Sequence, residues 1–286
     1  MQSPLEIAGH VTLVFPHDGM PKVLVETKWS TAEVYLHGAH ITRFQKKDEP
    51  PLLFLSRFSE FIPQKAIRGG VPIIFPWFGG RENKPAHGFA RTSEWHLLQT
   101  KLLLDHSVSL HFGLPRVEGF EIEYLIVVGE TLTMELSIKN TSNLQTTFEN
   151  CLHTYLQISS IDAISISGLA ATLYVDKLNN HQPLDISPSL HITEEVDRIY
   201  SDTTTTVEIH DPGFNRTIQI EKSGSNSTIV WNPWIEKSKV MPDFGDEEYQ
   251  QMVCIESGNI TPNQITLSSR ECAVLKVGLS SRKLLI

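Results

Sequence analysis

Alternation of apolar and polar residues is the dominant pattern along the chain. In residues 131–140 (TLTMELSIKN), Leu132, Met134, Leu136 and Ile138 alternate with polar residues. Because successive side chains of a strand point to opposite faces, this pattern predicts a half-buried strand. Similar patterns rich in Val, Ile, Thr and Tyr predict further strands at residues 22–29, 33–44, 123–129, 206–211, 216–222 and 273–279.

Helical periodicity is almost missing from the sequence. No segment carries an apolar stripe over three helical turns, and residues 56–62 could form at most one short turn. There is also no internal repeat and no break in composition. We therefore expect an all-β fold, a large and mostly antiparallel β-sandwich with few short helices, as a single domain over residues 1–286.

Three stretches interrupt the alternation, at residues 67–91, 148–159 and 229–259. Each of them sets polar side chains among aromatic ones. Concave ligand sites combine apolar walls with a few fixed polar groups in the same way. These three stretches are therefore the first candidates for a binding or catalytic site.

Residues 148–159 (FENCLHTYLQIS) are interpreted as one strand, which places His153 and Tyr155 on the face opposite the leucines. An imidazole titrates near neutral pH, which suits proton transfer. A single histidine on a strand is nevertheless more often a hydrogen-bonded structural residue. Both interpretations of His153 stay open on these residues alone.

Residues 251–257 (QMVCIES) predict another strand, in which Met252, Cys254 and Glu256 share a face. An ionised carboxylate on such an apolar strand is costly unless it is hydrogen-bonded. Glu256 could cap the following turn, or it could be a general base whose basicity is raised by dry surroundings. Four tryptophans lie near the unusual stretches, where they could pack in the core or stack on a sugar: Trp77, Trp95, Trp231 and Trp234.

Charge and composition narrow the class of partner. The chain has 286 residues, 40% of them hydrophobic, and a formal net charge of −9. A negative protein is a poor nucleic-acid binder, because phosphate backbones require a basic surface. A small anionic ligand needs only two or three local cations. We expect a monomer with a small-molecule partner, and no nucleic-acid or membrane partner.

The three cysteines lack the spacing of a zinc or disulfide framework, so we expect reduced, mostly buried thiols. His37 and His40 are not followed by an acidic or cysteine residue at the sequence spacing of metal ligands. We therefore expect both histidines in the core or the pocket. No HExxH, GxSxG, Walker A or GxGxxG motif is present. We expect neither a bound metal nor another cofactor. The chain starts without a signal-peptide pattern, which favours a cytoplasmic location.

Five motifs occur in a recognisable order: RGGVPIIFPWFG (68–79), HGFAR (87–91), LHTYL (152–156), VWNPW (230–234) and DFGDEEYQQMVCIESGN (243–259). With them the chain resembles the hexose-6-phosphate mutarotase branch of the aldose 1-epimerase superfamily. The resemblance implies a large β-sandwich of the galactose mutarotase-like type with a groove on one sheet. It also implies an isomerase that interconverts α and β anomers of hexose 6-phosphates, chiefly glucose 6-phosphate, without a cofactor.

The resemblance also implies roles for individual residues. His153 corresponds to the general acid of the family and Glu256 to its general base. Arg68 and Arg91 correspond to arginines that bind the substrate and are linked to phosphate recognition.

Two further positions follow from the resemblance. His87 lies in the groove, and Asp197 corresponds to an aspartate that contacts the sugar. Some relatives carry Gln where this chain has Ala86, so the resemblance does not carry over one sugar hydrogen bond, while the implied chemistry is unaffected. Three alternatives stay open: an epimerase of free sugars, a noncatalytic sugar-phosphate-binding regulatory protein, and a carbohydrate-binding module.

Overall fold

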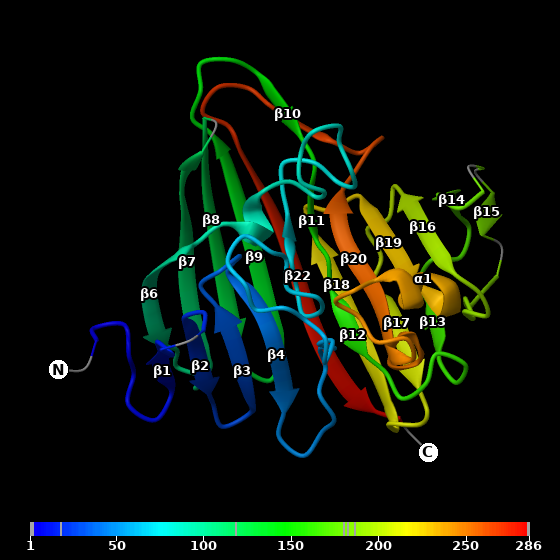
Figure 1. The fold of residues 1–286 in the computed structure, drawn as a ribbon, viewed down its shortest axis with the longest axis horizontal. Helices are drawn as coiled ribbons and strands as arrows, with labels where there is room; N and C mark the ends of the chain where they lie inside the picture. Colours follow the sequence, from blue (N-terminus) through cyan, green and yellow to red (C-terminus); the bar gives the residue numbers. More distant parts are fainter. Residues whose placement is uncertain are drawn as a thin grey trace.

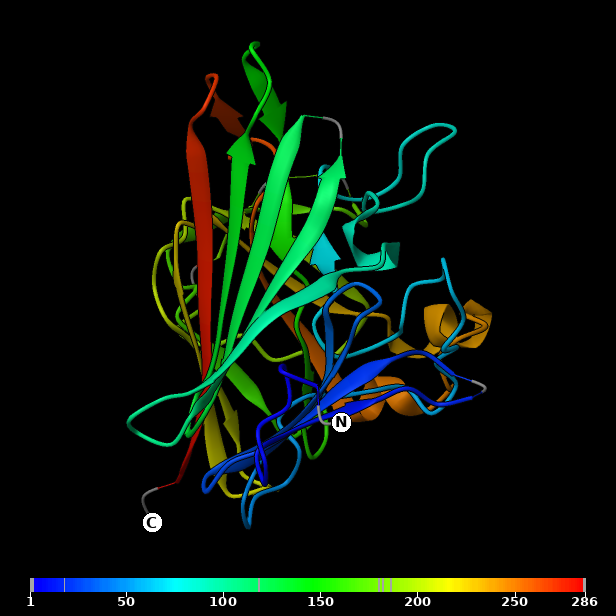
Figure 2. The ribbon, with the colours of Figure 1, turned by 90° about the vertical axis from the view of Figure 1, so that its left-hand side faces the viewer.

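Two large antiparallel sheets form the body of the molecule (Figures 1 and 2). The computed structural model describes residues 3–17, 19–117, 119–179, 181, 183–185 and 187–284. One continuous apolar core joins buried residues of both sheets, such as Ile126 and Leu136 of one and Val253 and Ile255 of the other. The expectation of an all-β sandwich is therefore confirmed.

The sheet that carries the candidate site is called the site sheet. Its order is β15–β14–β16–β19–β20–β11–β5, and β12 also pairs with β20. In this order the strands are β15 (Leu184–Asp185), β14 (Thr172–Asp176), β16 (Val196–Ser201), β19 (Ser227–Asn232), β20 (Met252–Asn259), β11 (Asn150–Leu152), β5 (Ile73–Ile74) and β12 (Tyr155–Gln157). All eight residues of β20 are buried, which fits its central place in the sheet.

The second sheet is called the back sheet. Its strands in order are β13 (Ser165–Ser167), β17 (Val207–Asp211), β18 (Arg216–Ser223), β22 (Cys272–Lys283), β9 (Leu132–Asn140), β8 (Phe120–Val128), β7 (Val108–Val117) and β6 (His96–Leu102). Buried and half-buried residues alternate without exception along β8 and β9. The period-two pattern of residues 131–140 therefore does mark a strand with one face in the core.

The smaller elements lie around the two sheets. One further sheet has the strands β1 (Val11–Val14), β2 (Lys22–Glu26), β3 (Ser30–Tyr35) and β4 (His40–Lys46), and another pairs β10 (Thr146–Phe148) with β21 (Ile265–Leu267). The helical segments are α1 (Trp234–Val240) and two short 3-10 turns, η1 (Ala90–Thr92) and η2 (Glu248–Gln251). No helix in the described part of the chain is long and apolar enough to cross a membrane.

Two of the expected single strands are wrong in their extent. Residues 33–44 form the end of β3 and the start of β4, because Gly38 and Ala39 have positive φ angles and turn the chain between them. Residues 148–159 form parts of β10, β11 and β12 rather than one strand. Of these three strands, β10 does not belong to the site sheet, because it pairs with β21 in a separate sheet.

The helix α1 was not predicted, and local hydrogen bonds explain why it forms. The side chain of Asn232 accepts a hydrogen bond from the amide of Trp234 at 2.9 Å and donates to the carbonyl oxygens of Tyr249 and Met252. The helix is seven residues long. That is too short to show an apolar stripe in the sequence.

One buried arginine ties the layers together. The Arg216 guanidinium on β18 donates to the carbonyl oxygens of Pro50, Pro51 and Gln157 at 2.7–3.1 Å. Its Nε lies 3.7 Å from a carboxylate oxygen of Asp211. The back sheet is thus bonded directly to the end of β12, which follows His153 in the site sheet.

Candidate active site

His153 and Glu256 face each other across neighbouring strands. β11 and β12 both pair with β20, and a short gap separates them. Leu152 pairs with Ser257 before this gap and Tyr155 pairs with Cys254 after it, so the register is the same on both sides. His153 therefore falls opposite Glu256, and its Nε2 lies 3.2 Å from Oε1 of that carboxyl group. The two predicted acid–base residues are within hydrogen-bond distance.

Burial controls the protonation of this pair. His153 is 7% and Glu256 1% exposed. Loss of hydration raises the pKa of Glu256 well above its usual value, and the negative charge of Asp197 adds to this effect. Burial also lowers the pKa of His153, and the positive charges of Arg91 and Arg68 lower it further. Together the two groups hold one proton over a wide pH range, because both the doubly protonated and the proton-free pair carry a buried net charge.

The ring of His153 is positioned by packing. It stacks on Tyr155 with a centroid distance of 4.8 Å and an interplanar angle of 11°. The rings of His87 and Trp231 contact it edge-on. Its Nδ1 has no hydrogen-bond partner among the described residues. Tyr155 therefore has the largest part in fixing the orientation of this imidazole.

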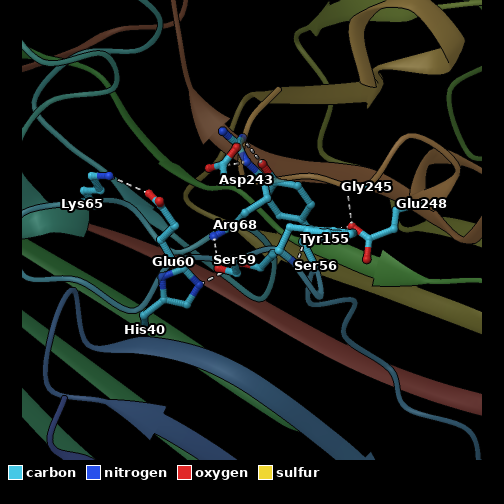
Figure 3. Close-up of polar contacts among 12 residues, drawn as sticks. His40, Ser56, Ser59, Glu60, Lys65, Arg68, Tyr155, Asp243, Gly245 and Glu248 are labelled. Atoms are coloured by element: carbon cyan, nitrogen blue, oxygen red, sulfur yellow. Dashed lines mark hydrogen bonds and ion pairs between the residues drawn. The ribbon is translucent and has the colours of Figure 1, made fainter. Parts of the chain in front are cut away.

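The RGG segment brings Arg68 beside Tyr155 (Figure 3). Arg68 donates from Nη1 to the Tyr155 hydroxyl and from Nε to a carboxylate oxygen of Asp243, both at 3.1 Å. The backbone turns here through Gly69 and Gly70, with φ angles of 119° and 61°. A Cβ atom on Gly70 would lie 2.1 Å from a carbonyl oxygen. Only glycine fits this close approach without strain.

Two backbone hydrogen bonds connect the same segment to the strand of His153. The amide of His153 donates to the carbonyl of Pro72 at 3.0 Å, and the amide of Tyr155 donates to that of Gly70 at 2.9 Å. On the other side, the buried His40 ring contributes a 2.7 Å hydrogen bond to the carbonyl of Gly69. His40 is therefore a core residue that supports the loop.

Arg91 stands behind this arrangement. Its Nη2 donates to the carbonyl of Ala86 at 2.9 Å, and its buried Nε has no hydrogen-bond partner among the described residues. Burial lowers the pKa of Arg91, the nearby positive charge of Arg68 lowers it further, and Tyr155 opposes both. Two guanidinium groups thus share a poorly solvated region.

The side chains surround a cavity of about 370 Å³. Its lining comes from all three unusual stretches of the sequence, from Asp197 on β16 and from Lys177, just beyond β14. The lining residues are Arg68, Phe78, Gly79, Gly80, His87, His153, Tyr155, Lys177, Asp197, Trp231, Lys237, Met241 and Glu256. Five of the six predicted site residues meet here; Arg91 does not line the cavity and acts on it through its charge.

His87 and Asp197 hold fixed positions in the wall. The Nδ1 atom of His87 accepts a 3.3 Å hydrogen bond from the amide of Gly79, and burial lowers the pKa of His87 to about 3. This imidazole is therefore neutral at ordinary pH. Asp197 on β16 lies directly across from Trp231 on β19, and its carboxylate is 3.5 Å from the ammonium of Lys177.

Several residues of the site were missed. Lys177 lies just beyond β14, in a stretch without a distinctive motif, and nothing in its sequence neighbourhood indicates the cavity. Lys237 and Asp243 do belong to segments singled out for their mixed polar and aromatic composition. Their contacts, to Glu195 and to Arg68, involve residues far away in the chain and could not be inferred from spacing.

The comparison with known proteins agrees with this geometry. The family model described as aldose 1-epimerase matches residues 21–277. The chain belongs to the aldose 1-epimerase family. Membership of this family supports an isomerase with sugar mutarotase activity.

Relatives of this aldose 1-epimerase family member cover most of its length. A protein of Cenchrus ciliaris is 31% identical over 91% of this chain and 84% of its own, and one of Haemophilus influenzae is 34% identical over 85% and 87%. Both carry the name "Putative glucose-6-phosphate 1-epimerase". The crystal structure of a mutarotase from Salmonella typhimurium, titled "putative", superposes with a TM-score of 0.90 at 26% identity, over 98% of this chain and 96% of that one.

Proposed function

We propose that this chain interconverts the α and β anomers of hexose 6-phosphates, chiefly glucose 6-phosphate, by acid–base catalysed ring opening and closure. The observation that carries the proposal is the buried 3.2 Å contact between His153 and Glu256 in the wall of a cavity that also exposes Arg68. Ring opening of a sugar needs an acid and a base positioned together.

In the proposed reaction, Glu256 takes the proton of the C1 hydroxyl while His153 gives a proton to the ring oxygen. The ring opens to the aldehyde, C1 rotates about the C1–C2 bond, and closure reverses both transfers. The pair starts as carboxylate and imidazolium, and it is carboxylic acid and neutral imidazole while the sugar is open. Both states hold one proton, which the direct contact allows the two residues to share.

The charges around the cavity support an anionic substrate. Its lining includes three cations, Arg68, Lys177 and Lys237, and two acidic side chains, Asp197 and Glu256. Burial favours the neutral form of Glu256. Each of the three cations has a carboxylate partner, Asp243, Asp197 or Glu195. Arg91, half-buried and outside the lining, has no carboxylate partner and an unpartnered Nε among the described residues. A phosphate dianion would offset this remaining positive charge, and guanidinium groups bind its oxygens well.

The walls suit the remainder of a hexose. Phe78 and Trp231 line the cavity together with the ring of Tyr155. Aromatic rings offer apolar faces on which a pyranose ring can lie. Asp197 and His87 provide hydrogen-bonding groups between these rings, as ligand pockets of this kind require.

NMR magnetisation transfer tests the proposal by measuring anomer exchange of glucose 6-phosphate with and without the protein, with glucose in parallel. We expect faster exchange chiefly for the phosphosugar. The Glu256→Gln variant should lose about 10²-fold or more of this acceleration, whereas Glu123→Gln, on the exposed side of the back sheet, should keep it. Equal acceleration of both sugars would indicate a free-sugar epimerase. Binding without acceleration would indicate a noncatalytic regulatory protein.

A further inference from the structure

Three side chains in the site offer metal-binding atoms within 4.8 Å of one another: His153, Cys254 and Glu256. All three are buried, and Cys254 is fully inaccessible. The sheet register explains the cluster, because Cys254 and Glu256 are two residues apart on one face of β20 and Tyr155 pairs with Cys254. An imidazole, a thiol and a carboxyl group therefore converge at one point.

The donor set and its spacing suit zinc. Around a tetrahedral Zn²⁺, nitrogen, oxygen and sulfur ligands lie about 3.3–3.8 Å from each other. Nε2 of His153 and Oε1 of Glu256 are already 3.2 Å apart. Because the three ligand atoms lie within 4.8 Å of one another, the Cys254 sulfur would need to approach by at most about 1 Å. A χ1 rotation of about 30° supplies this movement at a modest cost in rotamer strain.

We propose that Zn²⁺ binds reversibly to Nε2 of His153, Sγ of Cys254 and the carboxylate of Glu256, and that it thereby inhibits the enzyme. Bound zinc occupies the lone pairs that accept and release the proton, so the acid–base pair cannot act. The inhibitory effect rests on the proposed function, whereas the binding itself does not.

The surroundings favour an open, three-ligand site. His153 and Glu256 both line the cavity, so the fourth position of the ion faces the space where water or a sugar hydroxyl can reach it. One thiolate and one carboxylate balance the charge of Zn²⁺, which reduces the cost of burying the complex. The second carboxylate oxygen of Glu256 accepts a 3.6 Å hydrogen bond from Cys151 Sγ, and this leaves Oε1 for the metal.

The surroundings of the imidazole make the binding reversible. Nδ1 of His153 has no acceptor among the described residues, and metal-bound histidines usually gain affinity from such a partner. Zinc is held by the deprotonated thiol and carboxyl group, so its binding releases protons.

The binding test uses Co²⁺ as a spectroscopic probe of the full chain and Zn²⁺ as its competitor. We expect a cobalt–thiolate absorption band that Zn²⁺ abolishes. The Cys254→Ser variant should lose this band and bind Zn²⁺ about tenfold more weakly or worse. Cys272→Ser, which removes the exposed thiol on β22, should behave like the wild type. Glu256→Gln, at a different ligand, should also weaken binding.

The activity test measures anomer exchange at increasing Zn²⁺, each variant being compared with its own metal-free rate. Inhibition that a chelator reverses, and that Cys254→Ser relieves, supports the proposal. A wild-type cobalt spectrum without a thiolate band, or zinc affinity unchanged in both folded ligand variants, overturns it. Because binding is measured without turnover, a chain that binds zinc but has no epimerase activity would contradict only the proposed function.

Discussion

At the scale of single residues, the site depends on groups whose charges are poorly hydrated. Burial of Glu256 and His153 favours neutral forms, and the contact between them keeps one proton in the pair. Arg68 differs from this pair because its charged side chain has partners: it donates hydrogen bonds to the Tyr155 hydroxyl and to Asp243 in the wall of the cavity. These residues give separate tests of catalysis and of anion binding.

Replacing Arg68 with alanine should affect the phosphosugar selectively. Hydrogen bonds to a charged group contribute about 1.5–3 kcal/mol, so KM for glucose 6-phosphate should rise roughly 10- to 100-fold while binding of glucose changes little. Arg57→Ala is the matched control, since that side chain is 81% exposed and its one ion pair among the described residues is with Glu248. Equal losses for both sugars would rule out a phosphate role for Arg68.

The pH dependence of kcat should show a broad plateau with a fall on either side. Burial lowers the pKa of His153 from 6.5 and raises that of Glu256 from 4.5. The acid limb, where the pair gains a second proton, therefore lies below pH 6.5. The alkaline limb, where the last proton leaves, lies well above pH 4.5. The uncatalysed rate is subtracted from each measurement. A narrow maximum in the remaining rate would contradict a proton shared by the pair. The Glu256→Gln variant should lack the alkaline limb, because it has no carboxyl group to lose that proton.

Much of this site could be predicted from single residues. Strict alternation placed Cys254 and Glu256 on one face of β20, and the motif around His153 identified the facing strand. Tyr155 was placed on the right face, but its stacking on His153 and its bond to Arg68 could not be foreseen. Such contacts join distant parts of the chain, and only the assembled sheet brings them together.

At the scale of elements, the segment between β4 and β5 determines where Arg68 stands. Gly70 occupies the left-handed region, and its amide donates to the carbonyl of Phe54 at 2.7 Å. The paired glycines, Gly69 and Gly70, let the chain turn tightly here with positive φ angles. The sequence did not indicate α1, because seven residues following a strand carry too little periodicity.

The Gly70→Ala variant should be markedly less stable. An added Cβ would lie 2.1 Å from the carbonyl oxygen of Ile41 and 2.9 Å from Nε2 of His40. The backbone conformation alone costs an L-residue about 1–3 kcal/mol, and the clash adds to this. Urea unfolding measures the loss. Gly80→Ala, which meets no atom within 4 Å, is the control, and similar midpoints for the two variants would refute the argument.

At the scale of the whole molecule, polar side chains cross between the two sheets. Arg216 bonds to three carbonyl oxygens, and Lys222 of the back sheet reaches the Thr203 and Thr228 hydroxyls and the carbonyl of Ser227 at 2.7–2.9 Å. All of these partners of Lys222 are neutral. Burial lowers the pKa of Lys222 to about 7. The alternation along β18 places Arg216 and Lys222 on the same face as its buried isoleucines, but their partners on other segments could not be inferred from the sequence.

Lys222 should make the stability of the fold depend on pH. Between pH 7 and 10.5 the unfolded chain binds a proton at this lysine and the folded chain does not, so its contribution to stability rises with pH. Lys222→Met removes this dependence. The difference in unfolding free energy between variant and wild type should therefore change by up to about 1.4 kcal/mol per pH unit in this window.

Urea unfolding at pH 7 and 9 provides the measurement. Lys276→Met, on the neighbouring strand β22 with a side chain 51% exposed, is the control for loss of a lysine that is not buried. If the difference in unfolding free energy between Lys222→Met and the wild type did not change with pH, the argument would be wrong. The ammonium group would then be stabilised in the fold as strongly as in water.

The two backbone hydrogen bonds from His153 and Tyr155 to Pro72 and Gly70 have a consequence for substrate length. They attach the segment that carries Arg68 to the strand that carries the proposed acid, main chain to main chain. The backbone thus sets the distance between the two segments, and the bonds from the Arg68 side chain to Tyr155 and Asp243 hold the guanidinium at one end of it. In the proposed reaction these are the phosphate-binding and ring-opening ends of the cavity. In the proposed reaction, a sugar phosphate one carbon shorter could occupy one end or the other, but it would not span both.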